Sequence, residues 1–181
     1  MTGEKFLEVK NLRTYFDTPE GMVKSVDGVS FSINRGETLA LVGESGCGKT
    51  VTSLSLIRLL ADTARVQADY MEVDGQKILE LTKDEARKLR GSKISMIFQE
   101  PMTSLNPVYR IERQLGEVFR LHEPNLTKAQ VFEKSVEILK KVGVPNPAER
   151  LKVYPHQLSG GLRQRVMIAI SLASNPQMLI A

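Results

Sequence analysis

The sequence has little cysteine, no long apolar run and no signal-peptide pattern in its first residues. Cys47 is the single cysteine among 181 residues, which excludes an internal disulfide and a cysteine-rich metal site within the chain. No segment approaches the ~18–20 consecutive apolar residues that cross a bilayer. Residues 1–5 lack the apolar stretch of a signal peptide. We therefore expect a cytoplasmic protein.

A concentrated basic segment is also missing. The formal net charge is +4, and the 25 lysines and arginines are interleaved with 21 acids. A nucleic-acid-binding arm would show a dense basic block, so no nucleic-acid partner is expected. With 41% hydrophobic residues, the chain can form one globular domain with a real core and room for a subdomain.

One motif stands out at residues 43–50, which fit the phosphate-binding pattern G-x-x-x-x-G-K-[ST] at every fixed position. The apolar run 38–42 predicts a buried strand before it. Apolar residues at helical spacing over 51–60 predict a helix after it. Strand, glycine-rich loop and helix form the usual context of a phosphate site. A glycine-rich turn that merely joins strand to helix is the alternative, and it is disfavoured because both flanks fit.

The residue types in this loop suit a nucleotide and Mg²⁺. Glycines let successive amides point at one anion, and the helix N-terminus adds its positive dipole end. Lys49 can reach the β- and γ-phosphates, and the Thr50 hydroxyl can ligate Mg²⁺. We interpret Cys47 as a small filler, not a nucleophile. The predicted nucleotide-binding residues of the loop are Gly43, Glu44, Ser45, Gly46, Cys47, Gly48, Lys49 and Thr50.

The remaining elements predict a β-layer and a helical insert. Strands at 6–10 and 29–33, joined by tight turns, indicate an antiparallel β-layer beside the nucleotide site. Further strands are predicted at 70–75, 94–98 and from 178 onward. Helices are predicted from 81 to 88, over 111–142 with a capping box at Thr127, and over 163–173. Gly143 should end the second of these, and Pro145 and Pro147 should prevent its restart.

Two more motifs follow the phosphate loop. Gln99 closes a predicted buried strand, and Ser159-Gly160-Gly161 opens a helix. In this order the motifs resemble the nucleotide-binding subunit of an ATP-binding cassette (ABC) transporter over nearly the whole chain. The resemblance implies an α/β fold: a P-loop NTPase core of the ABC ATPase type, with the antiparallel β-layer and an inserted α-helical subdomain. Residues 1–181 would form one domain. Residues 1–100 would hold the β-layer and P-loop, 101–162 the helical subdomain with the signature, and 163–181 the return to the core.

The same resemblance assigns site residues. Phe16 would stack on adenine, with Tyr15 as the near alternative, although an ordinary core aromatic fits either position equally well. Gln99 would touch Mg²⁺ and the attacking water, unless it is only a surface glutamine. The resemblance thus implies Lys49 and Gln99 as the catalytic residues, and Thr50 and Gln99 as the metal contacts.

The helix-opening motif would act across a subunit boundary. Ser159, Gly160 and Gly161 would contact the γ-phosphate of ATP held by a partner subunit, where the plain alternative is a helix cap. Leu162 stands where the family pattern has glutamine.

Within this family the chain most resembles the ATPase subunits of dipeptide and oligopeptide importers. The residues that carry this are 43–49, 98–107 and 154–165. Importers of nickel, glutathione and other small solutes share much of them. The partners implied are transmembrane permease subunits and a second ATPase subunit, identical or different, with the protein peripheral on the inner face of the cell membrane.

The family pattern places an aspartate and then a glutamate general base after the apolar strand at 178–181, and this chain contains neither. His122 and His156 precede the signature and cannot replace the family's switch histidine. We expect a truncated chain that binds ATP and hydrolyses it poorly, from a full-length ATPase.

Three rival readings stay open. A soluble ABC-type ATPase of repair or translation, acting on nucleic acid, carries the same motifs. A P-loop kinase or GTPase leaves Ser159-Gly160-Gly161 without a role, and the guanine-reading Asn-Lys-x-Asp pattern is absent. A non-enzymatic fragment that folds poorly is the third.

Overall fold

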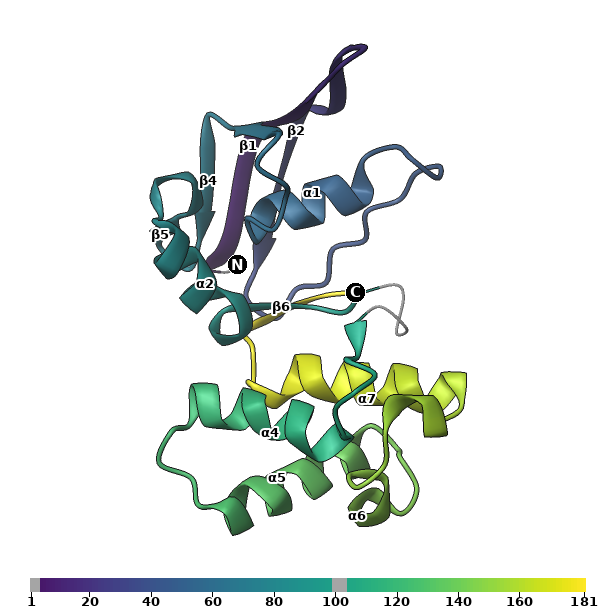
Figure 1. The fold of residues 1–181 in the computed structure, drawn as a ribbon. Coiled ribbons are helices and arrows are strands. Elements are labelled where there is room, and N and C mark those ends of the chain that lie inside the picture. Colours follow the sequence, from purple (N-terminus) through teal and green to yellow (C-terminus); the bar gives the residue numbers. More distant parts are fainter. Residues whose placement is uncertain (1–3, 99–103) are drawn as a thin grey trace. The chain divides into compact units, whose positions relative to one another are not determined.

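A computed structural model describes residues 4–98 and 104–181. The chain divides into two compact units, residues 1–90 and 91–181 (Figure 1). The predicted division of the chain at residues 100 and 162 stays a prediction.

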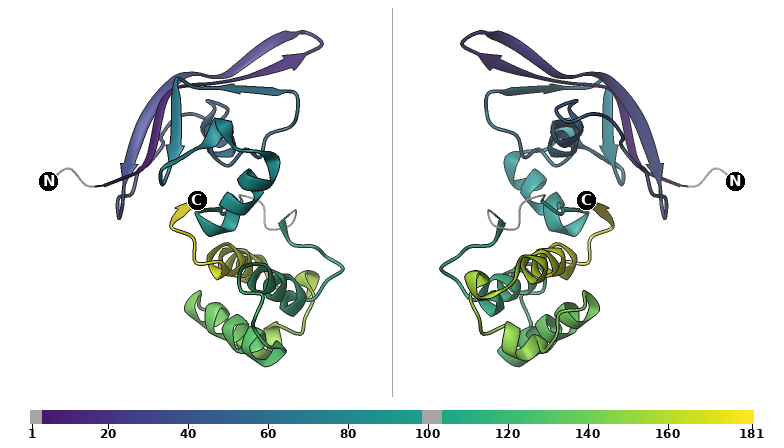
Figure 2. Two further views of the ribbon diagram at one scale, coloured as in Figure 1. Left: turned by 90° about the vertical axis from the view of Figure 1, so that its left-hand side faces the viewer. Right: turned by 90° about the vertical axis from the view of Figure 1, so that its right-hand side faces the viewer.

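The first unit is built on an antiparallel sheet with the order β2-β1-β4-β5, with β3 pairing to β1. Figure 2 shows β1 and β2 extending together as one long hairpin. The predicted strands 6–10 and 29–33 lie within it, and the predicted strand 70–75 is present over residues 70–73, which confirms the antiparallel β-layer. The strands are β1 (Lys5–Thr18), β2 (Gly21–Asn34), β3 (Ala64–Gln67), β4 (Tyr70–Val73) and β5 (Gln76–Lys77).

One face of this sheet is apolar and carries the helix that follows the phosphate loop. Leu7 and Val9 alternate along β1 and are fully buried, as expected where a strand buries every second residue. Helix α1 (Lys49–Leu56) lies beside β1 and β2 (Figure 1). Thr14 Oγ1 and Ser55 Oγ form a buried hydrogen bond of 2.8 Å between β1 and α1. A 3₁₀ turn (Ile78–Glu80) and helix α2 (Lys83–Ser92) follow, and the unit ends within α2, at Arg90.

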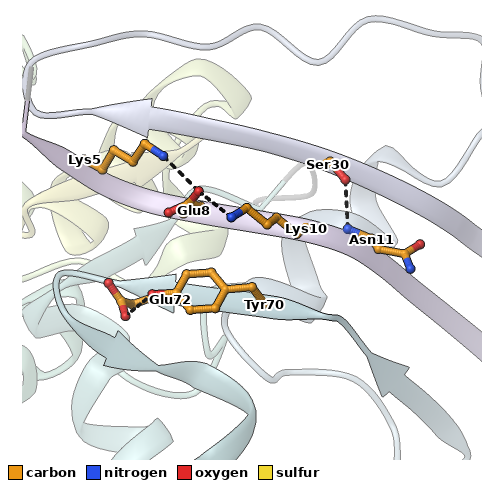
Figure 3. A network of polar contacts seen from close by, with 7 residues as sticks. All are labelled: Lys5, Glu8, Lys10, Asn11, Ser30, Tyr70 and Glu72. Carbon is orange, nitrogen blue, oxygen red and sulfur yellow. Dashed lines mark hydrogen bonds and ion pairs between the residues drawn. The ribbon is translucent and has the colours of Figure 1, made fainter. Parts of the chain in front are cut away.

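The sheet also carries a network of polar contacts on β1 and β4 (Figure 3). Glu8 accepts from Lys5 Nζ at 2.8 Å and lies 3.2 Å from Lys10 Nζ. These lysines lower the pKa of the Glu8 carboxyl. The Tyr70 hydroxyl donates to Glu72 on β4. The hairpin can therefore present one face to solvent and the other to α1.

The predicted strand at 38–42 is wrong. Among the described residues none pairs with this segment. Leu41 is 40% and Val42 92% exposed, so the run is not buried either. An apolar, β-branched run becomes a strand only where a neighbouring strand accepts its ladder hydrogen bonds, and the sheet of the first unit offers no such neighbour.

The second unit combines a small parallel sheet with a helical cluster. Strand β6 (Ile94–Met96) pairs with β7 (Met178–Ile180), with Ser95 opposite Leu179. The predicted strand 94–98 is thus shorter than expected, and Phe98 is exposed. The helical segments predicted over 111–142 and 163–173 are confirmed as α4 (Ile111–His122), α5 (Lys128–Lys141) and α7 (Gly160–Ala173). A short helix that was not predicted, α6 (Pro147–Arg150), and a 3₁₀ turn at Pro155–Gln157 lie between α5 and α7.

Local signals set most helix ends here. Thr127 and Gln130 form the predicted capping box at the start of α5. Gly143 follows α5 in the left-handed conformation (φ 75°), as a glycine after a helix end commonly does. Pro147 does not prevent a new helix but opens α6, because proline is well suited to the first turn. No helix within the described ranges is long and apolar enough to span a bilayer.

Candidate functional site

The loop between residues 43 and 48 is shaped by its glycines. Gly46 and Gly48 adopt φ angles of 82° and 92°, a region that glycine enters at little cost. The Cys47 amide donates to the Glu44 carbonyl at 3.3 Å and closes the turn. The loop therefore passes into α1 with Gly48 as the residue that caps the helix.

A side chain at either of two glycines in this loop would make a close contact, with backbone at Gly48 and with a side chain at Gly43. A Cβ on Gly48 would lie 2.3 Å from the Ser25 carbonyl oxygen, and one on Gly43 would lie 2.5 Å from Cys47 Sγ. Ser25 itself is skipped in the β1–β2 register, which passes from Thr14↔Val26 to Tyr15↔Lys24. This is a β-bulge, and the Ser25 carbonyl in it lies close to Gly48 of the phosphate loop.

Lys49 folds back over the loop. Its Nζ donates to the carbonyls of Gly43 at 2.8 Å and Glu44 at 2.7 Å, and lies 3.5 Å from Cys47 Sγ. An ammonium with three donors can exchange such carbonyl partners for phosphate oxygens. The positive charge is thus held at the mouth of the loop.

The start of α1 supplies the remaining positive potential. The first helical hydrogen bond runs from the Thr52 amide to the Gly48 carbonyl at 2.8 Å, so the preceding amides have no partner within the helix. Thr50 is exposed on this first turn. Amides, dipole and Lys49 together make a site for an anion with several oxygens. Across the described residues, no group of three His, Cys, Asp or Glu side chains could hold a metal ion.

Phe16 and Tyr15 lie on opposite faces of β1, since strand residues alternate. Tyr15 donates its hydroxyl to Asp27, and Lys24 Nζ lies 5.4 Å from its ring centre. Phe16 shares its face with Thr14, which contacts α1. The role of Phe16 at adenine stays a prediction.

In the second unit, Ser159 caps α7 and its side chain accepts from the Leu162 amide at 3.4 Å. Gly160 and Gly161 are exposed, and a Cβ at either would meet nothing within 4 Å. Packing within the described chain therefore does not require glycine here. Gln99 and residues 100–103 lie outside the described residues, so the predicted roles of Gln99 stay predictions.

One contact near this motif was missed by sequence reasoning. Arg165, in the second turn of α7, donates from Nη1 to the carbonyls of Val142 at 3.0 Å and Gly143 at 2.9 Å. A cation at a helix C-terminus is favourable because carbonyls there lack helical partners. Arg165 therefore joins α7 to the end of α5. The sequence pattern around Arg165 does not predict these partners, because they lie 22–23 residues away in the sequence.

A glycine loop that positions a lysine at a helix N-terminus defines a phosphate-binding loop protein. Residues 26–181 match the family model described as "ABC transporter". The chain belongs to the ABC transporter family.

Its relatives include proteins named for peptide transport. It is 46% identical over 181 residues to the dipeptide transport ATP-binding protein DppD of Lactococcus lactis, covering 100% of this chain and 52% of that protein. It is 49% identical over 178 residues to the oligopeptide transport ATP-binding protein OppD of Escherichia coli, covering 98% and 52%. The chain thus spans about half the length of these curated relatives.

Solved structures agree on the fold. The chain matches the dimeric structure of the bacterial ABC transporter cassette MJ0796 with a TM-score of 0.84 and 26% identity, over 96% of this chain and 72% of that one. The same scores relate it to a post-hydrolysis state of that cassette bound to ADP and Pi. These neighbours confirm the predicted α/β fold of the ABC ATPase type.

Proposed function

We propose that this chain is the nucleotide-binding part of an ATPase subunit that energises the import of dipeptides or oligopeptides. The observation that carries the proposal is Lys49, held at the mouth of loop 43–48 by two carbonyls and placed at the N-terminus of α1. The names of the relatives support peptides as the cargo.

The loop fits Mg·ATP. Lys49 would exchange the Gly43 and Glu44 carbonyls for β- and γ-phosphate oxygens, while the first amides of α1 donate to the same phosphates. The exposed Thr50 hydroxyl would hold Mg²⁺ together with those oxygens. When bound, the metal neutralises the charge that develops on the transferred phosphoryl group. Phe16, on the α1 side of β1, would lie under the adenine.

The proposed site is completed by a second subunit. Gly160 and Gly161 leave open space at the start of α7, so backbone amides there are accessible to a γ-phosphate bound by a partner chain. Ser159 would add its hydroxyl. We further propose that Gln99 orients the attacking water, and that permease subunits hold the assembly on the inner face of the membrane.

Residues 1–181 alone would bind ATP and turn it over slowly. The family pattern adds a metal-binding aspartate and a general-base glutamate after β7, and these 181 residues include neither. A general base contributes ~10²–10⁴-fold to a rate. ATP binding depends on loop 43–50 and does not need it.

The proposal is tested by uptake of a labelled dipeptide and tripeptide into vesicles that carry the assembled transporter. We expect ATP-dependent uptake with the wild-type subunit and background uptake with Lys49→Ala, because the phosphate contact is lost. Uptake that is insensitive to Lys49→Ala would contradict the function, and ATP-dependent uptake of nickel or glutathione without peptides would contradict the cargo.

A further inference from the structure

One peptide group of β6 is held from both sides. The Ile97 amide donates to the Ile180 carbonyl of the neighbouring chain segment at 2.8 Å. The carbonyl of the same peptide group, that of Met96, accepts from Ser171 Oγ on α7 at 3.1 Å. The N–H and C=O of a trans peptide point in opposite directions, so this group joins β7 on one side to α7 on the other.

Ser171 makes a hydrogen bond outside its own helix in addition to the bond that a helical serine commonly makes within it. Its hydroxyl also lies 3.1 Å from the Met167 carbonyl one turn earlier, and such back-bonding is common. The bond to Met96 is different because it leaves the helix and reaches a strand 75 residues away in the sequence. Ser171 is 7% exposed, so water competes little for this hydroxyl.

We propose that Ser171 is a positioning residue that fixes strand β6 on helix α7. Helix α7 begins at Gly160, directly after Ser159, and β6 ends three residues before Gln99 in the sequence. The inference rests on the proposed ATPase function for its catalytic consequence. Ser171 lies 12 residues after Ser159, a helical distance of roughly 18 Å. A rigid helix joined to β6 makes the γ-phosphate-binding end of α7 and the strand leading to Gln99 move as one body.

The chain offers a matched control. Ser135 in α5 is 1% exposed, and its hydroxyl donates to the Val131 carbonyl of the same helix at 2.7 Å. Within the described ranges no bond joins it to another element. Ser135→Ala therefore removes a buried helical hydroxyl with the same back-bond, without touching a strand.

The experiment uses the full-length protein in its transporter, as wild type, Ser171→Ala, Ser171→Thr and Ser135→Ala. Alanine is the best helix former, so loss of the fold is not expected. Steady-state ATP hydrolysis gives kcat and KM. Residue-resolved hydrogen exchange gives the protection of the Ile97 amide.

We expect Ser171→Ala to lower kcat about three- to tenfold with KM for ATP unchanged, and to speed Ile97 exchange by a similar factor, the size of one lost hydrogen bond. Ser171→Thr should restore both, and Ser135→Ala should match the wild type in both. Equal kcat in the two alanine variants would overturn the inference, and so would faster exchange without a change in kcat. An inactive wild-type protein would instead contradict the proposed function, and exchange at Ile97 would still decide whether Ser171 joins β6 to α7.

Discussion

Gly48 is the residue on which the shape of the phosphate loop depends most. It combines a left-handed backbone (φ 92°) with the close approach of the Ser25 carbonyl oxygen. Gly46 has a similar φ of 82° but open space around the position of a Cβ. Comparing substitutions at Gly46 and Gly48 therefore distinguishes the cost of the left-handed backbone from the cost of a steric contact.

We therefore expect Gly48→Ala to destabilise the protein more than Gly46→Ala. The left-handed conformation costs a non-glycine residue roughly 1–2 kcal/mol, which both variants incur. Gly48→Ala adds overpacking against backbone, about 1–3 kcal/mol more. Urea unfolding of the two variants and the wild type measures the difference, and equal stability of both would contradict the packing of β2 against the loop.

The Tyr15–Asp27 pair across the hairpin predicts a pH dependence. The hydrogen bond to Asp27 raises the pKa of the Tyr15 hydroxyl, and the same bond, aided by Lys24, lowers the pKa of Asp27. The stabilisation from Tyr15 is complete below its ordinary pKa and is lost as pH rises through the raised value. That from Asp27 is present above its ordinary pKa and is lost as pH falls through the lowered value.

Ultraviolet titration of tyrosine, with Tyr15→Phe to identify the signal, tests this prediction. Asp27→Asn should bring the pKa of Tyr15 down toward that of a free tyrosine. Asp17→Asn, which removes a partner of Arg65 from the same strand, serves as the control and should leave Tyr15 unchanged. If the pKa of Tyr15 were the same in Asp27→Asn as in the wild type, the hydrogen bond between Tyr15 and Asp27 would be absent in solution.

The residues of the phosphate loop could be predicted because each is fixed by local chemistry. The pattern of 43–50 specifies two glycines, a lysine and a hydroxyl, and the structure places them in one loop at a helix start. Ser25 and Arg165 could not be predicted, since each acts through a backbone carbonyl or a partner far away in sequence. Contacts of that kind leave no trace in spacing or composition.

Among the elements, those with local signals were predicted well. The capping box at Thr127 sets the start of α5 through bonds between residues three apart. The predicted strand at 38–42 was wrong for the opposite reason, because a strand needs a pairing partner that no local pattern reveals. The prediction that Pro147 prevents a new helix was wrong because a proline that follows one helix is equally suited to begin another.

Loss of the capping box should weaken the helical unit. Thr127→Ala removes the side-chain acceptor of the Gln130 amide, and such changes cost about 0.5–2 kcal/mol. Chemical unfolding of the variant should show this loss. Thr127→Ser keeps the hydroxyl and should stay near the wild type. If alanine proves as stable as serine there, α5 is held by its packing alone.

For the whole molecule, membership of the ABC transporter family and its fold are established by the match over residues 26–181 and by the structural neighbours. The sequence predicted both, because the order of motifs along the chain is more specific than any one of them. Cargo, permease contacts and turnover stay proposals, because the chain spans about half the length of the curated relatives it matches.

The most direct test of the account is titration of the 181-residue chain with a fluorescent ATP analogue in the presence of Mg²⁺, for wild type and Lys49→Ala. Lys49→Ala removes a charge-assisted phosphate contact worth ~1.5–3 kcal/mol, and we predict a dissociation constant about ten- to a hundredfold higher. Ser135→Ala controls for general effects and should bind like the wild type. Equal affinity of the wild type and Lys49→Ala would contradict the assignment of loop 43–50 as the ATP site.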